Sequence, residues 1–182
     1  MLLLGLIAAL GLITALACAA PARADGFKGW RFGMTPQEVQ KVKACSPYTT
    51  VKVTGGLECS NFTFLGAKRN ISFVFQQDKL VKIQIWIYKG KADGEAADAL
   101  GKLARYLSKT HGKLECPELP DLASLPRRKL LKYLSHLKTK AAPTAKLQLK
   151  PAKDPRAFFT FSSLIYNQAH GYFLFTYLQP PR

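Results

Sequence analysis

The sequence predicts an α+β fold, in which an antiparallel β-sheet meander and a C-terminal hairpin carry one or two helices packed on one face. Three patterns support this class. Apolar residues alternate with polar ones over much of residues 51–87, recur at helical spacing over residues 94–110, and form aromatic runs over residues 158–178. Alternation is typical of strands with one buried face, and the helical spacing of a helix that lies on them.

A short helix is predicted over residues 36–44. Thr35 and Glu38 have the spacing of a capping box, in which each side chain accepts the backbone N–H of the other residue. Met34 and Val39 have the spacing of the matching hydrophobic staple. We therefore expect the helix to begin directly after Thr35 and to turn Val39 inward.

Strands follow in the middle of the chain. The alternation begins at Val51 and Val53, resumes after a Gly-Gly turn at 55–56, and is strictest over residues 81–87. We expect these segments to form the meander, with the alternating Val and Ile residues on the buried face.

Two aromatic residues of the last meander strand, Trp86 and Tyr88, alternate with the buried set. Together with Lys82 they form a candidate aromatic binding surface on the opposite face. The alternative is that another element covers them or that they pair across strands.

A second helix is predicted from Gly94 to Thr110. Asp93 has the position of an N-cap, and Gly112 is suited to end the helix. The leucines and alanines at helical spacing form one apolar face, so this helix is expected to pack across the meander.

A basic, Pro-rich excursion follows at about residues 117–156. Between residues 127 and 156 it holds ten Lys or Arg residues and one acid, Asp154, a net charge of +9. Residues 127–139 are predicted to form a basic helix capped by Ser124, and residues 141–155 a mobile linker. The chain then ends in the hairpin, with its turn at residues 167–171, which we expect to complete the sheet.

The leucines of the basic helix form one stripe, and basic residues flank it. Such helices lie on anionic membranes or contact acidic partners, whereas an ordinary surface helix packs its leucines on the domain. The candidate anion-contacting residues are Arg127, Arg128, Lys129, Lys132, Lys138 and Lys140.

The N-terminus has the order of a secretory signal. An uncharged apolar run over residues 2–20 is followed by Pro21 and an Ala-x-Ala pattern that ends at Ala24. A retained membrane anchor and lipidation at Cys18 are the alternatives. Cleavage of residues 1–24 would leave a single domain of 158 residues, 25–182, with a net charge of +15. That charge favours anionic partners, although a generally basic surface serves solubility too.

Export makes a disulfide between Cys45 and Cys59 the natural pairing, because it would join a helix end to a strand start. Cys116 is then left over. It is either buried, paired with another molecule, or a replacement partner in the bridge.

Catalytic and metal motifs are absent from the sequence. The three histidines are scattered, and no P-loop, nucleophile elbow or zinc pattern occurs. We therefore predict no catalytic residue, no metal and no cofactor. A secreted enzyme that uses Cys116 is the alternative, although its acidic neighbour Glu115 would raise the pKa of a thiol. Export also disfavours nucleic acid as the partner of the basic residues.

The segment Gly29 to Val39, with Phe-Gly-Met-Thr-Pro-Gln-Glu-Val at its end, resembles a pattern that opens small exported bacterial domains. It is also similar to the small lipoprotein of the outer-membrane β-barrel assembly machine. The resemblance implies a short helix packed on an antiparallel sheet, and as an alternative function an envelope-assembly scaffold whose basic charge is incidental.

Together these patterns predict a non-enzymatic binding or structural protein of a bacterial cell envelope. It would be periplasmic or secreted, or held at a membrane by its N-terminus. The expected partner is an anionic envelope component, such as a lipid, lipopolysaccharide or acidic polymer, or an envelope protein.

Overall fold

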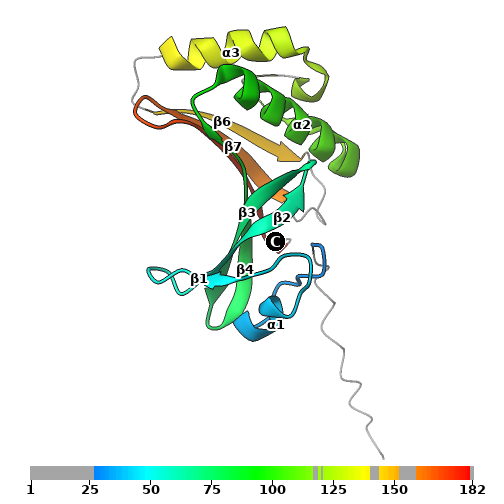
Figure 1. Ribbon diagram of the computed structural model, residues 1–182. Coiled ribbons are helices and arrows are strands. Elements are labelled where there is room, and N and C mark those ends of the chain that lie inside the picture. The colour runs from blue at the N-terminus through cyan, green and yellow to red at the C-terminus, as the bar shows by residue number, and fades with distance from the viewer. Residues whose placement is uncertain (1–26, 117–118, 120, 140–143, 152–158, 181–182) are drawn as a thin grey trace, which may run out of the picture.

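The computed structural model describes residues 27–116, 119, 121–139, 144–151 and 159–180. Within them one antiparallel sheet carries helices on one face, so the predicted α+β class is confirmed (Figure 1). The helices are α1 (Pro36–Gln40), α2 (Asp93–His111) and α3 (Arg127–Thr139), with a 3-10 helix, η1, at Leu122–Ser124. The strands are β1 (Thr49–Thr50), β2 (Leu57–Phe64), β3 (Ala67–Gln76), β4 (Lys79–Gly90), β5 (Leu114–Glu115), β6 (Thr144–Pro151), β7 (Phe159–Asn167) and β8 (Gly171–Leu178).

The last strand of the chain lies in the middle of the sheet. The strand order is β1-β2-β3-β4-β8-β7-β6-β5, and β4 pairs with β8 from Ile83 opposite Leu178 to Gly90 opposite Tyr172. The chain thus builds one half of the sheet as a meander, crosses over through α2 and α3, and builds the other half inward from its edge. The predicted meander and C-terminal hairpin are both present.

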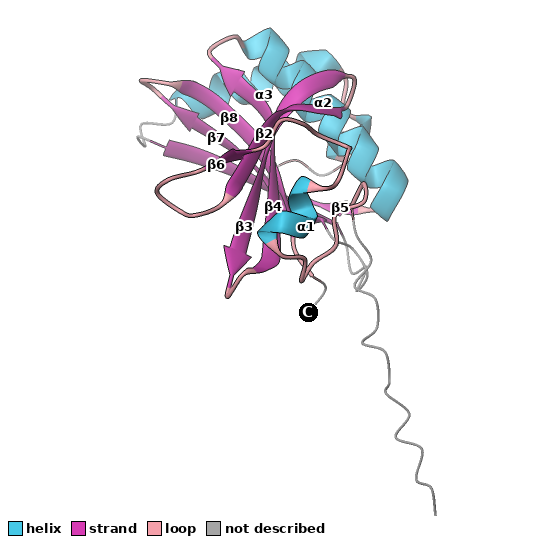
Figure 2. Cartoon of the chain, turned by 60° about the horizontal axis from the view of Figure 1, so that its bottom comes forward, coloured by secondary structure: helices cyan, strands magenta, loops and turns pink. Residues whose placement is uncertain are grey.

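One face of the sheet carries the core. Helices α2 and α3 cover one end of this face, and the N-terminal segment with α1 covers the other end (Figures 1 and 2). The leucines of α2 at 100, 103 and 107 are buried against the isoleucines of β4. At the other end the Trp30 ring lies 5.0 Å from the Phe73 ring, measured between centroids.

The loop after α1 is fastened to the sheet in two ways. The predicted disulfide between Cys45 and Cys59 is present and links this loop to β2. The Trp30 indole N–H donates to the Tyr48 hydroxyl at 3.0 Å, and that hydroxyl donates to the Val42 carbonyl at 2.9 Å. The disulfide indicates an oxidising, exported compartment.

The capping box of α1 is confirmed, but the helix is shorter than the predicted 36–44. The Thr35 amide donates to the Glu38 carboxylate at 2.8 Å, and this bond is the main cause that lowers the pKa of Glu38. After Gln40 the amides of Lys41 and Val42 bond to carbonyls three residues back, which tightens the turn and ends the helix.

Two predictions about extended structure are wrong. Val51 and Val53 do not form a strand, because the Val51 carbonyl accepts the amides of Thr54 and Gly55 in a tight turn that leaves Val53 94% exposed. The predicted linker over residues 141–155 contains β6, which pairs with β7 in continuous register from Thr144 to Leu149. Proline and lysine are typical of linkers, so composition alone does not reveal a strand whose backbone hydrogen bonds are made with a strand elsewhere in the chain.

The predicted signal peptide, residues 1–24, lies outside the described residues. Among the helices that the structure does describe, none is long and apolar enough to cross a membrane.

Candidate functional site

Helix α3 has the bounds that the sequence predicts, and its leucine stripe faces the domain. Leu130, Leu134 and Leu137 are each at most 2% exposed and belong to the core. Close approach to α2 depends on Gly101, since a Cβ added there would lie 3.2 Å from a methyl group of Leu130. The apolar face of α3 is therefore used for packing, as in an ordinary surface helix.

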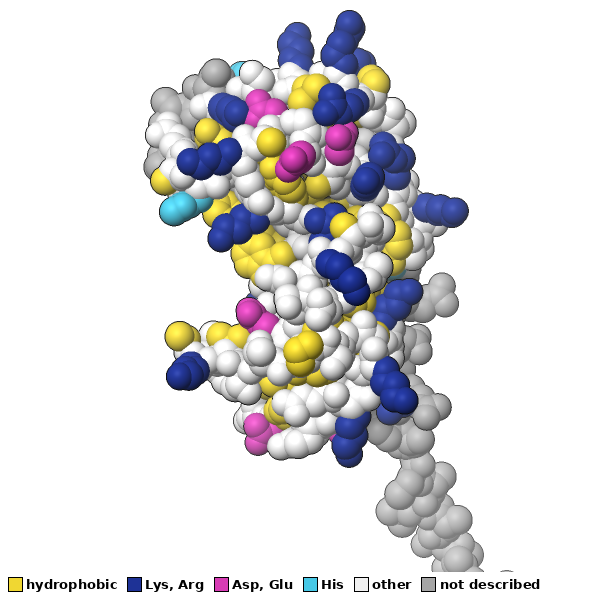
Figure 3. Space-filling view, viewed as in Figure 1, with side chains coloured by type: hydrophobic (Ala, Val, Ile, Leu, Met, Phe, Trp, Pro, Cys, Tyr) yellow, Lys and Arg dark blue, Asp and Glu magenta, His cyan; other side chains and the backbone are white. Residues whose placement is uncertain are grey.

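The basic face of α3 is what remains on the surface. Arg128, Lys129 and Lys132 are exposed, and Figure 3 shows Lys and Arg side chains projecting from the top of the molecule, where α3 lies. We call these three residues the α3 basic face. No acidic residue occupies the first turn of α3.

The other predicted contact residues have different surroundings. Arg127 forms an ion pair with Asp98 of α2, with 2.7 Å between Nε and Oδ1, and both side chains are about half exposed. Lys138 forms an ion pair with Asp93, and its Nζ lies 5.6 Å from the centre of the Tyr172 ring. Lys140 lies outside the described residues.

Asp93 does not cap α2, contrary to the prediction. The N-cap is Ala92, and Asp93 is the first residue of the helix. Its carboxylate instead accepts the Tyr172 hydroxyl at 3.1 Å and pairs with Lys138. The Tyr172 hydroxyl also lies 3.2 Å from the Leu134 carbonyl, so this cluster joins α2, α3 and β8. Burial first, and then the Asp93 carboxylate, raise the pKa of Tyr172 well above its ordinary value.

Replacing Tyr172 with phenylalanine tests this cluster. At neutral pH the variant should lose about 1 kcal/mol of unfolding free energy, because a buried hydrogen bond is removed. The folded protein binds the tyrosine proton more tightly than the unfolded chain, so wild-type stability should fall as pH rises above about 10, and the variant should fall less. Urea midpoints at pH 7 and pH 10.5 measure both effects. Tyr166→Phe, on the neighbouring strand β7, is the control and should keep the wild-type alkaline loss.

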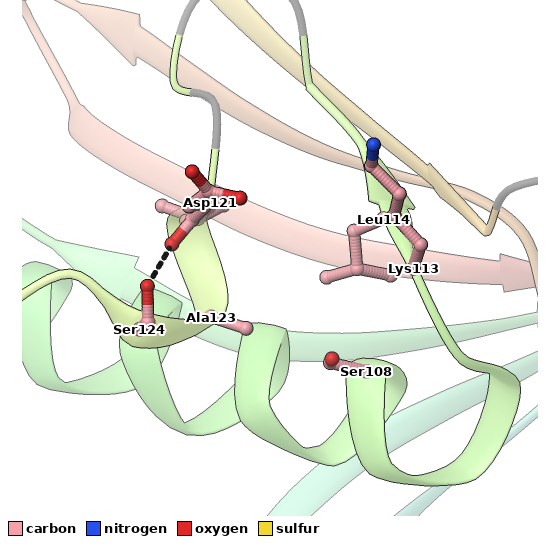
Figure 4. Close-up of a pocket in the computed structure, with 7 residues that line it drawn as sticks. Ser108, Lys113, Leu114, Asp121, Ala123 and Ser124 are labelled. Atoms are coloured by element: carbon pink, nitrogen blue, oxygen red, sulfur yellow. Dashed lines mark hydrogen bonds between the residues drawn. The ribbon is translucent and has the colours of Figure 1, made fainter.

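Among the described residues, a pair of hollows beside α2 can be compared. One, of about 180 Å³, lies between α2, β5 and η1 and is lined by Ser108, Lys113, Leu114, Asp121, Leu122, Ala123 and Ser124 (Figure 4). Ser124 does not cap α3 as predicted, because its hydroxyl donates to the Asp121 carbonyl at 2.9 Å and closes η1. The other, of about 260 Å³, is lined by Arg69, Tyr88, Glu95, Asp98, Ala99 and Lys102. Neither lining contains a cysteine or a histidine.

Cys116, directly after β5, is 7% exposed. Within the described residues, no three His, Cys, Asp or Glu side chains are grouped to hold a metal ion.

Trp86 and Tyr88 do not form one surface, because a bulge in β4 separates them. Trp86 pairs with Phe175 of β8, whereas Tyr88 pairs with Leu174, the next residue along β8. Successive residues of a strand point to opposite faces, so the two aromatics do as well. Tyr88 faces α2, where its hydroxyl lies 3.2 Å from the Ala92 carbonyl.

Trp86 instead shares the outer face of the sheet with aromatic residues of β8 that the sequence did not connect to it. These residues are Phe173, Phe175 and Tyr177. Their alternation in the C-terminal run was the available signal. The pairing of β4 with β8, which brings them beside Trp86, could not be derived from it.

A family model described as an uncharacterised protein matches residues 27–115, which include α1, α2 and the disulfide but not α3 or strands β6 to β8. No curated protein and no solved structure matches the chain.

Proposed function

We propose that this protein is an exported, non-enzymatic binding protein of the bacterial cell envelope, in the periplasm or outside the cell. Its α3 basic face contacts an anionic surface. The disulfide supports export, because such bonds persist in oxidising compartments. The burial of Cys116 favours a structural use of this thiol over a nucleophilic one.

The observation that carries the proposal is the way α3 is held. Its leucines are fixed in the core, so Arg128, Lys129 and Lys132 are presented on a rigid element. Arg128 and Lys129 also lie in the first turn, where positive charge opposes the helix dipole and weakens the helix. Helix stability therefore does not explain this placement. Binding of an anionic group does, since lysine and arginine attract it and the helix N-terminus favours it.

The test uses purified protein and vesicles that contain phosphatidylglycerol, with neutral phosphatidylcholine vesicles for comparison. Each basic side chain near an anionic surface contributes about 1 kcal/mol, so R128E/K129E/K132E should weaken binding on the order of 100-fold or more. Binding of the wild type should also weaken steeply as salt is raised.

The matched control is K28E/K41E/K43E, which makes the same change in net charge at exposed positions of the N-terminal segment. It should keep most of the affinity. If both variants lose affinity equally, binding reflects net charge alone and the α3 basic face is not the contact.

An envelope-assembly scaffold is the second candidate. Its support is the Met34 to Val39 segment, whose capping box forms and whose helix α1 packs against the sheet core through Val39. Capture of a defined envelope protein by the R128E/K129E/K132E variant, without vesicle binding, would favour this function over the first.

A further inference from the structure

The outer face of the sheet carries an aromatic cluster that is separate from the core. We define the outer aromatic strip as Trp86, Phe173, Phe175 and Tyr177. The Trp86 ring lies 5.5 Å from Phe175 and 6.4 Å from Phe173, and Phe175 lies 5.1 Å from Tyr177, measured between ring centroids. The core cluster and the residues packed against it contain none of the four. Trp86, Phe173 and Tyr177 remain partly exposed.

Lysines lie at both ends of this strip. The Lys82 ammonium lies 5.0 Å from the centre of the Tyr177 ring, and the Lys89 ammonium 5.7 Å from the centre of the Phe173 ring. Six residues of extended chain lie between the two lysines, a separation of roughly 20 Å along the strand. Gln84 lies between them opposite Tyr177. No acid occupies the outward positions of β4 and β8 described here. On β2, two strands from β4, Glu58 accepts the Ser72 hydroxyl at 3.0 Å.

We propose that the outer aromatic strip binds an anionic polysaccharide. The rings accept the C–H faces of sugar units, because the negative face of an aromatic ring attracts weakly positive hydrogens. Lys82 and Lys89 pair with carboxylate or phosphate groups along the same polymer. Their ammonium groups lie over the rings, so the positive charge is placed beside the bound sugars and attracts the negative charge of the polymer. Gln84 supplies an amide that donates to and accepts from sugar hydroxyls.

Two features favour a glycan over other anionic partners. The rings pack edge to face and stay partly buried, so none projects as an apolar anchor into a bilayer. The disulfide indicates an exported compartment, where nucleic acid is scarce and acidic glycans are common. A row of aromatic rings with a lysine at each end matches an extended polysaccharide, which presents sugar rings in a row and acidic groups at intervals.

This site is distinct from the α3 basic face. Helix α3 packs on α2 over the core face of the sheet, whereas the strip lies on the other face. Failure of vesicle binding by α3 variants therefore leaves the strip unaffected, and the two proposals are tested separately.

The chain offers an internal optical probe, since it contains two tryptophans. Trp30 is 0% exposed and hydrogen-bonded to Tyr48, whereas Trp86 lies in the strip. Addition of polygalacturonate to the full-length protein should change tryptophan emission and protect it from acrylamide quenching. Neutral dextran should do neither. W86F should abolish the emission change, because only the buried Trp30 would report.

The variants K82Q/K89Q and Y177T should each weaken polygalacturonate binding about tenfold, the effect of losing roughly 1.4 kcal/mol of ion-pair or ring contact. K41Q/K43Q removes the same charge from the N-terminal segment and should change affinity less than about twofold. Unchanged urea midpoints would show that the variants are folded. If K41Q/K43Q weakens binding as much, or if polygalacturonate leaves Trp86 quenching unchanged, the proposal is wrong. If phosphatidylglycerol vesicles or oligo-thymidylate protect Trp86 from acrylamide equally well, the strip is a lipid or nucleic-acid site and not a polysaccharide site.

Discussion

Replacing Cys45 and Cys59 with serine together is expected to lower the unfolding free energy by about 3 kcal/mol, because the unfolded chain loses a covalent loop. The two cysteines are 14 residues apart. For a domain of this size the loss corresponds to a melting temperature lower by on the order of 10 °C. The bridge also fixes the loop that supplies Tyr48, which holds the Trp30 indole, so the aromatic circular dichroism of Trp30 should weaken.

A reducing agent separates the bridge from the substitutions. Wild-type protein and Cys116→Ala should both show the drop in melting temperature when dithiothreitol is added, because both keep the bridge. C45S/C59S should show no further drop. A double variant that still responds to dithiothreitol would mean that another pairing, through Cys116, stabilises the fold.

Replacing Leu134 with alanine is expected to cost about 3 kcal/mol of unfolding free energy, since removal of a fully buried leucine leaves a cavity in the core beneath α3. Leu131→Ala in the same helix is the control, because Leu131 is only partly buried and the change in helix propensity is identical. Its cost should be clearly smaller. Urea denaturation measures both, and the dependence of free energy on urea should stay the same if folding remains two-state.

The same pair of variants tests how α3 meets a membrane. If its leucines are core residues, Leu134→Ala lowers stability while the folded variant keeps its affinity for phosphatidylglycerol vesicles. The opposite result, normal stability with lost vesicle binding, would mean that the stripe inserts into the bilayer and that α3 is not docked as the structure has it.

Local signals allowed several features to be predicted from the sequence. The Thr35 and Glu38 capping box, the bounds of α3 and the turn before Gly171 all depend on residues a few positions apart. The Asn167 side chain, for example, accepts the amides of Ala169 and His170 within one turn. Interactions of this kind join residues that are close in sequence, so the sequence alone indicates them.

Features that depend on distant pairing could not be predicted in the same way. Asp93 has the position of a cap, yet its partner Tyr172 lies 79 residues further along the chain. The bulge that separates Trp86 from Tyr88 follows from the register between β4 and β8, and alternation alone places both residues on one face. Strand β6 was missed because its lysines, its one proline and the flanking Pro143 and Pro155 are typical of a linker, whereas its backbone pairs with β7.

The candidate surfaces show the same division. The basic residues of α3 were identified correctly as a group on one helix, but the ion pairs of Arg127 and Lys138 require knowledge of where α2 lies. The outer aromatic strip needs two strands that are almost ninety residues apart in sequence to become neighbours. The sequence identifies the residue types, whereas the packing of helices and strands determines which of these residues are in contact.

The position of β8 has a consequence for how the protein reaches its compartment. Strand β8 joins the two halves of the sheet, so neither half can complete its pairing until β8 has been synthesised. Contacts so far apart in sequence form slowly, because a long loop must close before they add stability. We therefore expect the nascent chain to stay unfolded until β8 has been made, and an unfolded polypeptide is the form that a translocation channel can pass.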